Sequence, residues 1–147
     1  MKKFEILEHT TDLKIRVFGR TKEELFLNAL LAMENGLKAE IKNLYASRWI
    51  AEPYRQKPKT KNIKVKSIDF STLLVDFLSQ VLYLNQVNKE IYSDFKISQF
   101  SDREIEGKLI GQRAESFGED IKAVTYHNLD VHQKKDGSWE ATILFDI

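Results

Sequence analysis

The sequence predicts an α+β fold, a single compact domain of mostly antiparallel sheet with two main amphipathic helices and a C-terminal β-hairpin. Strand-like and helix-like patterns do not alternate regularly along the chain, as they would in a doubly wound α/β fold. The 147 residues suffice for one hydrophobic core and are too few for two comfortable domains, so we expect one domain over 1–147. Hydrophobic residues make up 42% of the chain, which is typical of a globular protein.

The first quarter of the chain predicts two strands followed by a helix. We expect strands over 3–8 and 13–18, the second because apolar and polar residues alternate along it. Thr21 and the glutamate three residues later have the spacing of a capping box, in which each side chain bonds a backbone N–H group. Hydrophobic residues then recur at helical spacing. We therefore expect an amphipathic helix over 22–35 that stops at Gly36.

The centre of the chain contains its strongest helical pattern. A broad apolar stripe predicts a central helix over about 70–87, and Asp69 is a suitable N-cap residue for it. Before this helix, apolar residues around Ile63 alternate with lysines and predict a strand. After it, we expect strands near 92–99 and 103–112.

The last quarter predicts a loop and then a hairpin. Residues 114–122 contain a glycine and several acids, and we expect a loop with one helical turn there. One hairpin strand includes 129–131. Asp136 and Gly137 form the expected two-residue turn, because both tolerate positive φ. The returning strand alternates from 139 to the end of the chain, with its apolar residues on one face.

Composition and missing motifs exclude several classes of protein. There is no cysteine, which removes disulfides, thiolate metal sites and thiol nucleophiles. No apolar run is long enough to span a membrane, and the charged start lacks the apolar core of a signal peptide, so we expect a cytoplasmic protein. The sequence contains no glycine-rich phosphate loop, dinucleotide fingerprint, Gly-x-Ser-x-Gly or His-Glu-x-x-His motif.

The net charge of +1 is not that of a protein that holds nucleic acid by electrostatics alone. Locally, however, the segment 54–66 contains six basic residues and no acid. We interpret it as a solvated loop that continues into an exposed strand edge, where lysines discourage edge pairing. The alternative is a surface for RNA, but no aromatic residue follows Tyr54 to stack on bases.

Acidic groups occur at both ends of the chain. Asp146 is followed by the α-carboxylate of Ile147, and Asp12 begins a strand-like run. If the fold joins the two ends, three carboxylate groups could meet, and they would need a cation. Oxygen ligands without cysteine and with little histidine favour hard cations, so Ca²⁺ or Mg²⁺ fits better than Zn²⁺.

Each candidate residue also has an ordinary explanation when it is taken alone. Asp12 can close a local turn with its neighbouring threonines, and Lys122 can be a surface lysine. His9 and His127 each lie at the end of an element, where a hydrogen-bonded structural histidine is the commoner case. His132 is expected to be exposed on the same face as its hairpin neighbour Asp130.

Four blocks in order resemble the archease family, and the resemblance covers nearly the whole chain. The blocks are His9-Thr10-Thr11-Asp12 continuing into Gly19-x-Thr21-x-x-Glu24-Leu25-Phe26, then Asp69-x-x-x-Leu73-Leu74-Val75-Asp76-Phe77-Leu78, then Ile121-Lys122-Ala123-Val124-Thr125-Tyr126-His127, and finally Phe145-Asp146-Ile147. The resemblance implies a small cytoplasmic cofactor protein, not an enzyme by itself. Such proteins activate an RtcB-type RNA ligase in tRNA splicing and RNA repair by promoting guanylylation and multiple turnover. RNA would be contacted only through the ligase.

The resemblance also implies the functional residues. A divalent cation, Ca²⁺ or Mg²⁺, would be held by Asp12, Asp146 and the α-carboxylate of Ile147, and Lys122 would act in activation. The chain departs from the family pattern near Asp12, where a lysine replaces a glycine, and at Glu115, near a place where the family often has histidine. Glu115 could replace that histidine as an oxygen ligand.

Two other functions stay open at this point. One is a stand-alone Mg²⁺-dependent hydrolase that uses Asp12 and Asp146, with Lys122 as an electrostatic stabiliser. The other is a small RNA-binding module that uses the lysines of 54–66.

Overall fold

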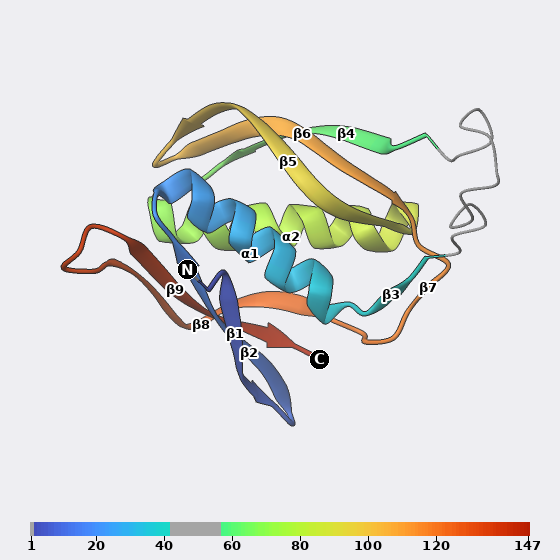
Figure 1. Ribbon diagram of the computed structural model, residues 1–147, viewed down its shortest axis with the longest axis horizontal. Coiled ribbons are helices and arrows are strands. Elements are labelled where there is room, and N and C mark those ends of the chain that lie inside the picture. The colour runs from blue at the N-terminus through green and yellow to red at the C-terminus, as the bar shows by residue number, and fades with distance from the viewer. Residues whose placement is uncertain (1, 42–56) are drawn as a thin grey trace.

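Two helices lie between two antiparallel sheets in a three-layer arrangement (Figure 1). The structure is a computed structural model, and it describes residues 2–41 and 57–147. The elements of the described residues, in chain order, are β1 (Phe4–His9), β2 (Asp12–Gly19), α1 (Lys22–Gly36), β3 (Ala39–Glu40), β4 (Lys59–Lys66), α2 (Phe70–Asn88), β5 (Glu90–Ser101), β6 (Glu104–Arg113), β7 (Ser116–Phe117), β8 (Ala123–Gln133) and β9 (Trp139–Asp146).

The sheet topology brings the two ends of the chain together. The four-stranded sheet has the order β1-β2-β9-β8, so the second strand of the chain pairs with the last. The three-stranded sheet has the order β4-β6-β5, and β3 and β7 form a small separate pair. All of these pairings are antiparallel. The predicted α+β class, with mostly antiparallel sheet and two helices, is confirmed.

The core fills the space between the helices and the two sheets. The apolar faces of both helices are buried there, together with inward residues of β2, β6 and β9. An aromatic group is central to it: the ring of Phe26 on α1 lies 5.5 Å from that of Phe77 on α2 and 5.2 Å from that of Phe100 on β5. These contacts join both helices to the three-stranded sheet.

Local capping sets the starts of both helices. Thr21 caps α1 by accepting a bond from the Glu24 N–H at 3.1 Å. The Glu24 carboxylate accepts from the Arg20 N–H at 3.3 Å and not from that of Thr21, so half of the expected capping box is confirmed. Asp69 caps α2 by accepting from the Thr72 N–H at 2.8 Å, as predicted.

The two helices end differently. Gly36 lies inside the last turn of α1, and the positive φ follows at Lys38 (49°), so Gly36 does not supply the left-handed stop expected of it. Its missing side chain matters for packing instead, because a Cβ there would lie 3.1 Å from Cδ2 of Leu13. α2 ends at Asn88 with Lys89 in the left-handed conformation.

Two local expectations for the last quarter of the chain are wrong, and one expected strand is longer than the part recognised in the sequence. Residues 114–122 contain no helical turn, because Ser116 pairs with Glu40 to form the short β3–β7 pair. The expected strand that includes 129–131 is confirmed as part of β8, which extends over 123–133 with a register shift and a positive φ at Asn128. The register shift made this strand hard to recognise from alternation alone.

The turn of the C-terminal hairpin is also longer than predicted. Gln133 pairs with Trp139, so five residues connect the strands. The Gly137 N–H donates to the Lys134 carbonyl at 3.0 Å, and Gly137 alone in this turn has a positive φ, of 91°. A turn followed by a glycine in the left-handed region is the common alternative to a two-residue loop.

The strand part of the basic segment agrees with its interpretation as a sheet edge. β4 is an edge strand of the three-stranded sheet, and its lysines are mostly exposed. Lys64 forms an ion pair with Glu104 at 3.3 Å. Residues 54–56 of that segment lie outside the described residues. No helix within the described ranges is long and apolar enough to cross a membrane.

A buried acid–amide pair links the two helices. The Asn85 amide of α2 donates to Oε1 of Glu34 on α1 at 2.8 Å, and the Tyr92 N–H donates to the same oxygen at 3.3 Å. Burial raises the pKa of Glu34 to about 8. The other oxygens of this pair, Glu34 Oε2 and Asn85 Oδ1, are buried and have no partner among the described residues. A proton on Oε2 would allow it to donate to Oδ1 and satisfy both.

We therefore predict that Glu34 makes stability pH-dependent. Its pKa is about 8 in the folded protein and near 4.5 when exposed, so the folded state retains a proton that the unfolded chain releases. Stability from this group should be complete below pH 4.5 and should fall as pH rises to 8, by at most about 4 kcal/mol. Glu34→Gln, whose amide can donate to Asn85 at any pH, should remove this slope. Urea unfolding at pH 5.5 and 8.5 measures how the free energy of unfolding changes with pH. An equal change in the wild-type protein and in Glu34→Gln would contradict the account.

Candidate functional site

The predicted carboxylates Asp12 and Asp146 lie directly opposite each other. β2 starts at Asp12 and β9 ends at Asp146, and the two are register partners. Their neighbours Leu13 and Phe145 are also partners and point into the core. Because side chains alternate along a strand, both carboxylates lie on the outward face of the sheet. Side chains paired in this way have Cβ atoms about 4.5–5.5 Å apart.

No ion pair within the described residues neutralises this pair, although Lys14 lies two positions from Asp12 on the same face of β2. Neither carboxylate has a hydrogen-bond or ion-pair partner within residues 2–41 and 57–147. Arg16, on the same face of β2, pairs instead with Glu5 at 2.9 Å and with Glu140 at 3.9 Å. Two like charges opposite each other in a sheet are destabilising, so the pair is a place where a cation would be favoured.

Ile147 and Lys122 adjoin the pair through the main chain. Ile147 directly follows Asp146, and its side chain packs against the core. The Lys122 N–H donates to the Asp146 carbonyl at 2.7 Å, and Ala123 is the register partner of Asp146. The exposed Lys122 also lines a groove of about 230 Å³ between α2 and β8. The fold thus gathers all four predicted residues, with Lys122 reaching toward α2.

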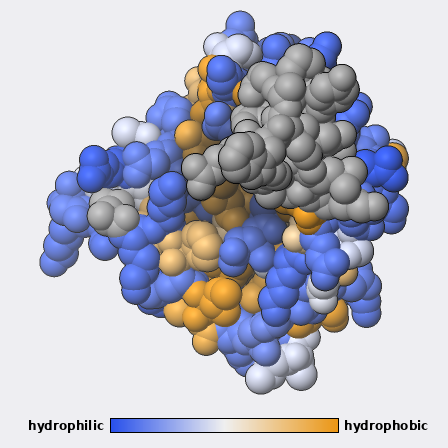
Figure 2. Space-filling view, turned by 45° about the vertical axis from the view of Figure 1, so that its right-hand side comes forward, coloured by the Kyte–Doolittle hydropathy of each residue, from blue (hydrophilic) through white to orange (hydrophobic). Residues whose placement is uncertain are grey.

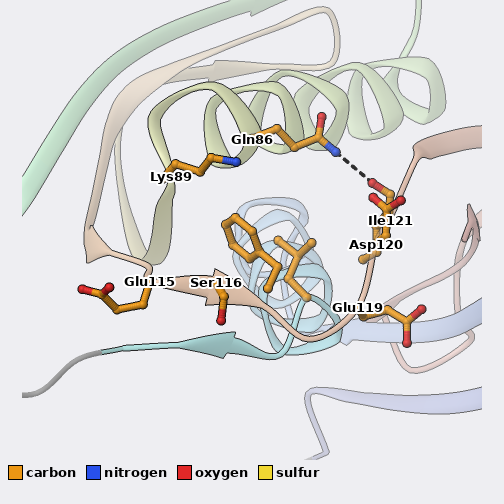
Figure 3. Close-up of a pocket in the computed structure, with 9 residues that line it drawn as sticks. Gln86, Lys89, Glu115, Ser116, Glu119, Asp120 and Ile121 are labelled. Atoms are coloured by element: carbon orange, nitrogen blue, oxygen red, sulfur yellow. Dashed lines mark hydrogen bonds between the residues drawn. The ribbon is translucent and has the colours of Figure 1, made fainter.

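A second cavity, of about 390 Å³, lies next to this end of the sheet. Its floor is apolar, and its rim includes Gln86 of α2, Lys89 just after this helix, and the acids of the β7–β8 connection (Figure 3). The Gln86 amide donates to the Ile121 carbonyl at 2.9 Å, which ties α2 to that connection (Figure 3). Figure 2 brings this end of the molecule forward and shows hydrophobic patches among hydrophilic side chains.

His9 joins this connection to the start of the chain. Its Nε2 lies 3.1 Å from Oε2 of Glu119, and both side chains are partly exposed. Glu119 is held in place because its N–H and that of Gly118 donate to carbonyls at the end of α1. The contact spans 110 positions of sequence. Sequence reasoning marked His9 as an element-end residue but had no signal for this partner.

Residues 4–147 match the model of the Archease protein family (MTH1598/TM1083). The chain belongs to the archease family. It is 32% identical to the protein archease of Methanosarcina barkeri, over 99% of this chain and 97% of that protein. It is 30% identical to the protein archease of Pyrococcus furiosus over the whole of both chains. The resemblance found in the sequence is therefore confirmed.

Two solved structures share this archease fold. The solution structure of Methanobacterium thermoautotrophicum protein 1598 superposes with a TM-score of 0.66 at 24% identity and covers all of both chains. The crystal structure of a Thermotoga maritima archease, described as a possible chaperone, gives a TM-score of 0.64 at 18% identity and covers 97% of this chain and 96% of that one.

The other histidines and Glu115 of this archease lie outside the pair. The carboxylate of Glu115 points away from the second cavity, at the opposite end from Glu119 and Asp120 (Figure 3). His127 is exposed on β8. His132 is held between Asp130, at 3.2 Å, and Glu140, at 3.3 Å, so it has one partner more than the expected Asp130.

The donor set fits a hard cation only if the chain end contributes. Within residues 2–41 and 57–147, no three side chains of His, Cys, Asp or Glu are grouped to hold a metal ion. Asp12 and Asp146 supply two carboxylates, and the third ligand predicted from the sequence, the α-carboxylate of Ile147, would adjoin them. Hard cations accept such oxygens and fill remaining positions with water.

We predict that the pair destabilises the protein when no cation is present. In buffer with a chelator, Asp12→Asn or Asp146→Asn should each raise the free energy of unfolding by about 0.2–1 kcal/mol, because either removes the repulsion. The double variant should gain little more than one single variant, since the repulsion can be removed only once. Urea unfolding measures this, and additive or destabilising effects would show that the two carboxylates do not interact.

Proposed function

We propose that this archease is a protein cofactor that activates an RtcB-type RNA ligase. In this role it promotes guanylylation and multiple turnover of the ligase in tRNA splicing and RNA repair, and it acts in the cytoplasm. The observation that carries the proposal is the unneutralised carboxylate pair of Asp12 and Asp146, fixed by the register of β2 and β9. Membership of the archease family supports the partner, because the family pattern implies the ligase.

A divalent cation, Ca²⁺ or Mg²⁺, is the proposed ligand of the pair. Asp12, Asp146 and the α-carboxylate of Ile147 would hold it, and it would supply positive charge between these carboxylates. Three carboxylates leave several positions of a hard cation open to water or to oxygen atoms of a partner. The sheet holds Asp12 and Asp146 in place, so the site does not need to form on binding.

Lys122 would have a separate role. An ammonium group cannot be a metal ligand, but it is a compact positive charge for a carboxylate or phosphate of the ligase complex. The backbone N–H of Lys122 donates to the Asp146 carbonyl, so the main chain of Lys122 is held beside the carboxylate pair. One partner surface could therefore contact both. RNA would be reached only through the ligase, and the archease would catalyse nothing alone.

The partner assignment predicts a specific activity. Small amounts of this archease should raise GTP-dependent ligation by its cognate ligase from single to multiple turnover, and the isolated protein should leave RNA and GTP unchanged. Gel assays of RNA joining with and without the archease measure this. Hydrolysis of RNA or nucleotide by the isolated protein that is lost in Asp12→Asn would favour the metal-dependent hydrolase instead.

The cation assignment predicts which changes weaken binding. Calorimetric titration with Ca²⁺ and Mg²⁺ should show at least about tenfold weaker binding in Asp12→Asn and Asp146→Asn, since each removes a charge but little volume. An extension after Ile147 should weaken binding too, because a peptide carbonyl would replace the carboxylate. Lys122→Ala is the control: it should retain cation binding and lose activation. Equal affinity in all of these proteins would exclude the carboxylate site.

A further inference from the structure

Helix α2 exposes two hydrophobic side chains beside strand β8. Tyr83 and Val87 are 56% and 58% exposed, although the neighbouring stripe of the helix is buried. They are four residues apart, so they lie on the same side of the helix. Tyr126 of β8 is also 56% exposed. Single exposed hydrophobic residues are common, but several on neighbouring elements favour an interaction surface.

The groove between α2 and β8 places Tyr83 in the same lining as Lys122, whereas Val87 and Tyr126 lie outside that lining on the same two elements. It has a volume of about 230 Å³ and is lined by Ser79, Leu82, Tyr83, Gln86, Lys122, Ala123 and Val124. Among the described residues, Lys122 is the only charged residue in this lining. From Asp76, beside Tyr126, to Val87 the helix rises about 16 Å, which is the length of a short peptide segment.

Tyr126 is held in position before any partner arrives. Its hydroxyl donates to the carboxylate of Asp76 on α2. The Asp76 carboxylate also accepts a hydrogen bond from the Ser67 hydroxyl at 2.8 Å. The ring is therefore fixed while its surface remains exposed. Rigid tyrosines bind with little loss of conformational entropy, and tyrosine is enriched among residues that dominate binding energy.

We propose that this surface, defined by Tyr83, Val87, Lys122 and Tyr126 and called the α2–β8 surface, docks a segment of the ligase. The inference rests on the proposed function and adds the contact surface to it. The segment would place an apolar side chain between the two tyrosines and a carboxylate at Lys122. Lys122 provides the positive charge of the groove lining within the described part of the chain, so the complementary segment is acidic at that point.

The position of the groove favours the ligase over an unrelated partner. The Lys122 N–H bonds the Asp146 carbonyl at 2.7 Å, so the end of the groove adjoins the carboxylate pair. Gln86, in the same lining, bonds the Ile121 carbonyl and fixes this end of α2 against the chain that leads to Lys122. A protein seated in the groove would lie at the β8 edge of the sheet, next to β9, and would reach the proposed cation by extending around this edge to the outward face.

The surface should determine affinity for the ligase and not the activated rate. We would titrate the archease against a fixed amount of ligase and measure the concentration for half-maximal activation and the maximal rate. Tyr83→Gln and Val87→Gln keep good helix formers at exposed positions and should fold normally. Each should raise the half-maximal concentration at least about tenfold and leave the maximal rate unchanged. Tyr126→Ala should act in the same way.

Ile6→Ala is the matched control. Ile6 is 50% exposed on β1, which lies at the opposite edge of the sheet from β8. Its replacement should therefore change neither the half-maximal concentration nor the maximal rate. Circular dichroism would verify that each variant is folded. If the wild-type protein activates the ligase but the three variants behave like Ile6→Ala, the docking surface is wrong and the proposed function stands.

Two other results would also overturn the docking surface. If the wild-type protein does not activate the ligase at all, both the proposed function and the docking surface fail. If sedimentation shows a wild-type dimer that Tyr83→Gln dissociates, the surface joins two copies of this chain and does not dock the ligase.

Discussion

The antiparallel pairing of β2 with β9 is the interaction on which the rest of the structure depends. Eight consecutive register pairs, from Asp12 with Asp146 to Gly19 with Trp139, join the beginning of the chain to its end. The inward members of these pairs cover the two helices, and β1 and β8 extend the sheet on either side. A shift of one residue would turn the apolar residues of one strand outward, so the hydrophobic pattern fixes the register. The same register sets two carboxylates face to face.

Local patterns in the sequence were enough to predict the elements that depend on neighbouring residues. Thr21 and Asp69 cap the helices they were expected to cap, and the apolar stripe of α2 is buried as its spacing indicated. The sequence could also predict that Asp12 and Asp146 converge if the two ends of the chain pair, because each lies at the end of an alternating strand. Features that depend on distant partners were missed. The two-residue pair of β3 and β7 has no pattern of its own, and the register shift in β8 interrupts alternation.

Contacts around the site also depend on distant partners that the sequence does not indicate. Nothing near His9 in the sequence indicates that it binds Glu119, 110 positions away. Glu34 falls among helix-forming residues and resembles an ordinary surface glutamate, yet the fold buries it against Asn85. The groove beside Lys122 exists only because α2 packs against β8, so its exposed tyrosines could not be related to Lys122 beforehand. The sequence predicted which residues form the site, and the cation remains a prediction, whereas the surroundings of each residue required the fold.

The central claim is that the β2–β9 register creates a cation site at Asp12 and Asp146. Its most direct test is a titration with Mn²⁺, a paramagnetic cation that prefers oxygen ligands, followed by NMR of the backbone amides. The account predicts that the amide signals of Asp12, Asp146 and Ala123 broaden first and that Asp146→Asn removes this effect. If the first signals to broaden belong instead to the second cavity, around Glu119 and Asp120, or if all signals broaden together, the register does not create the site and the account is wrong.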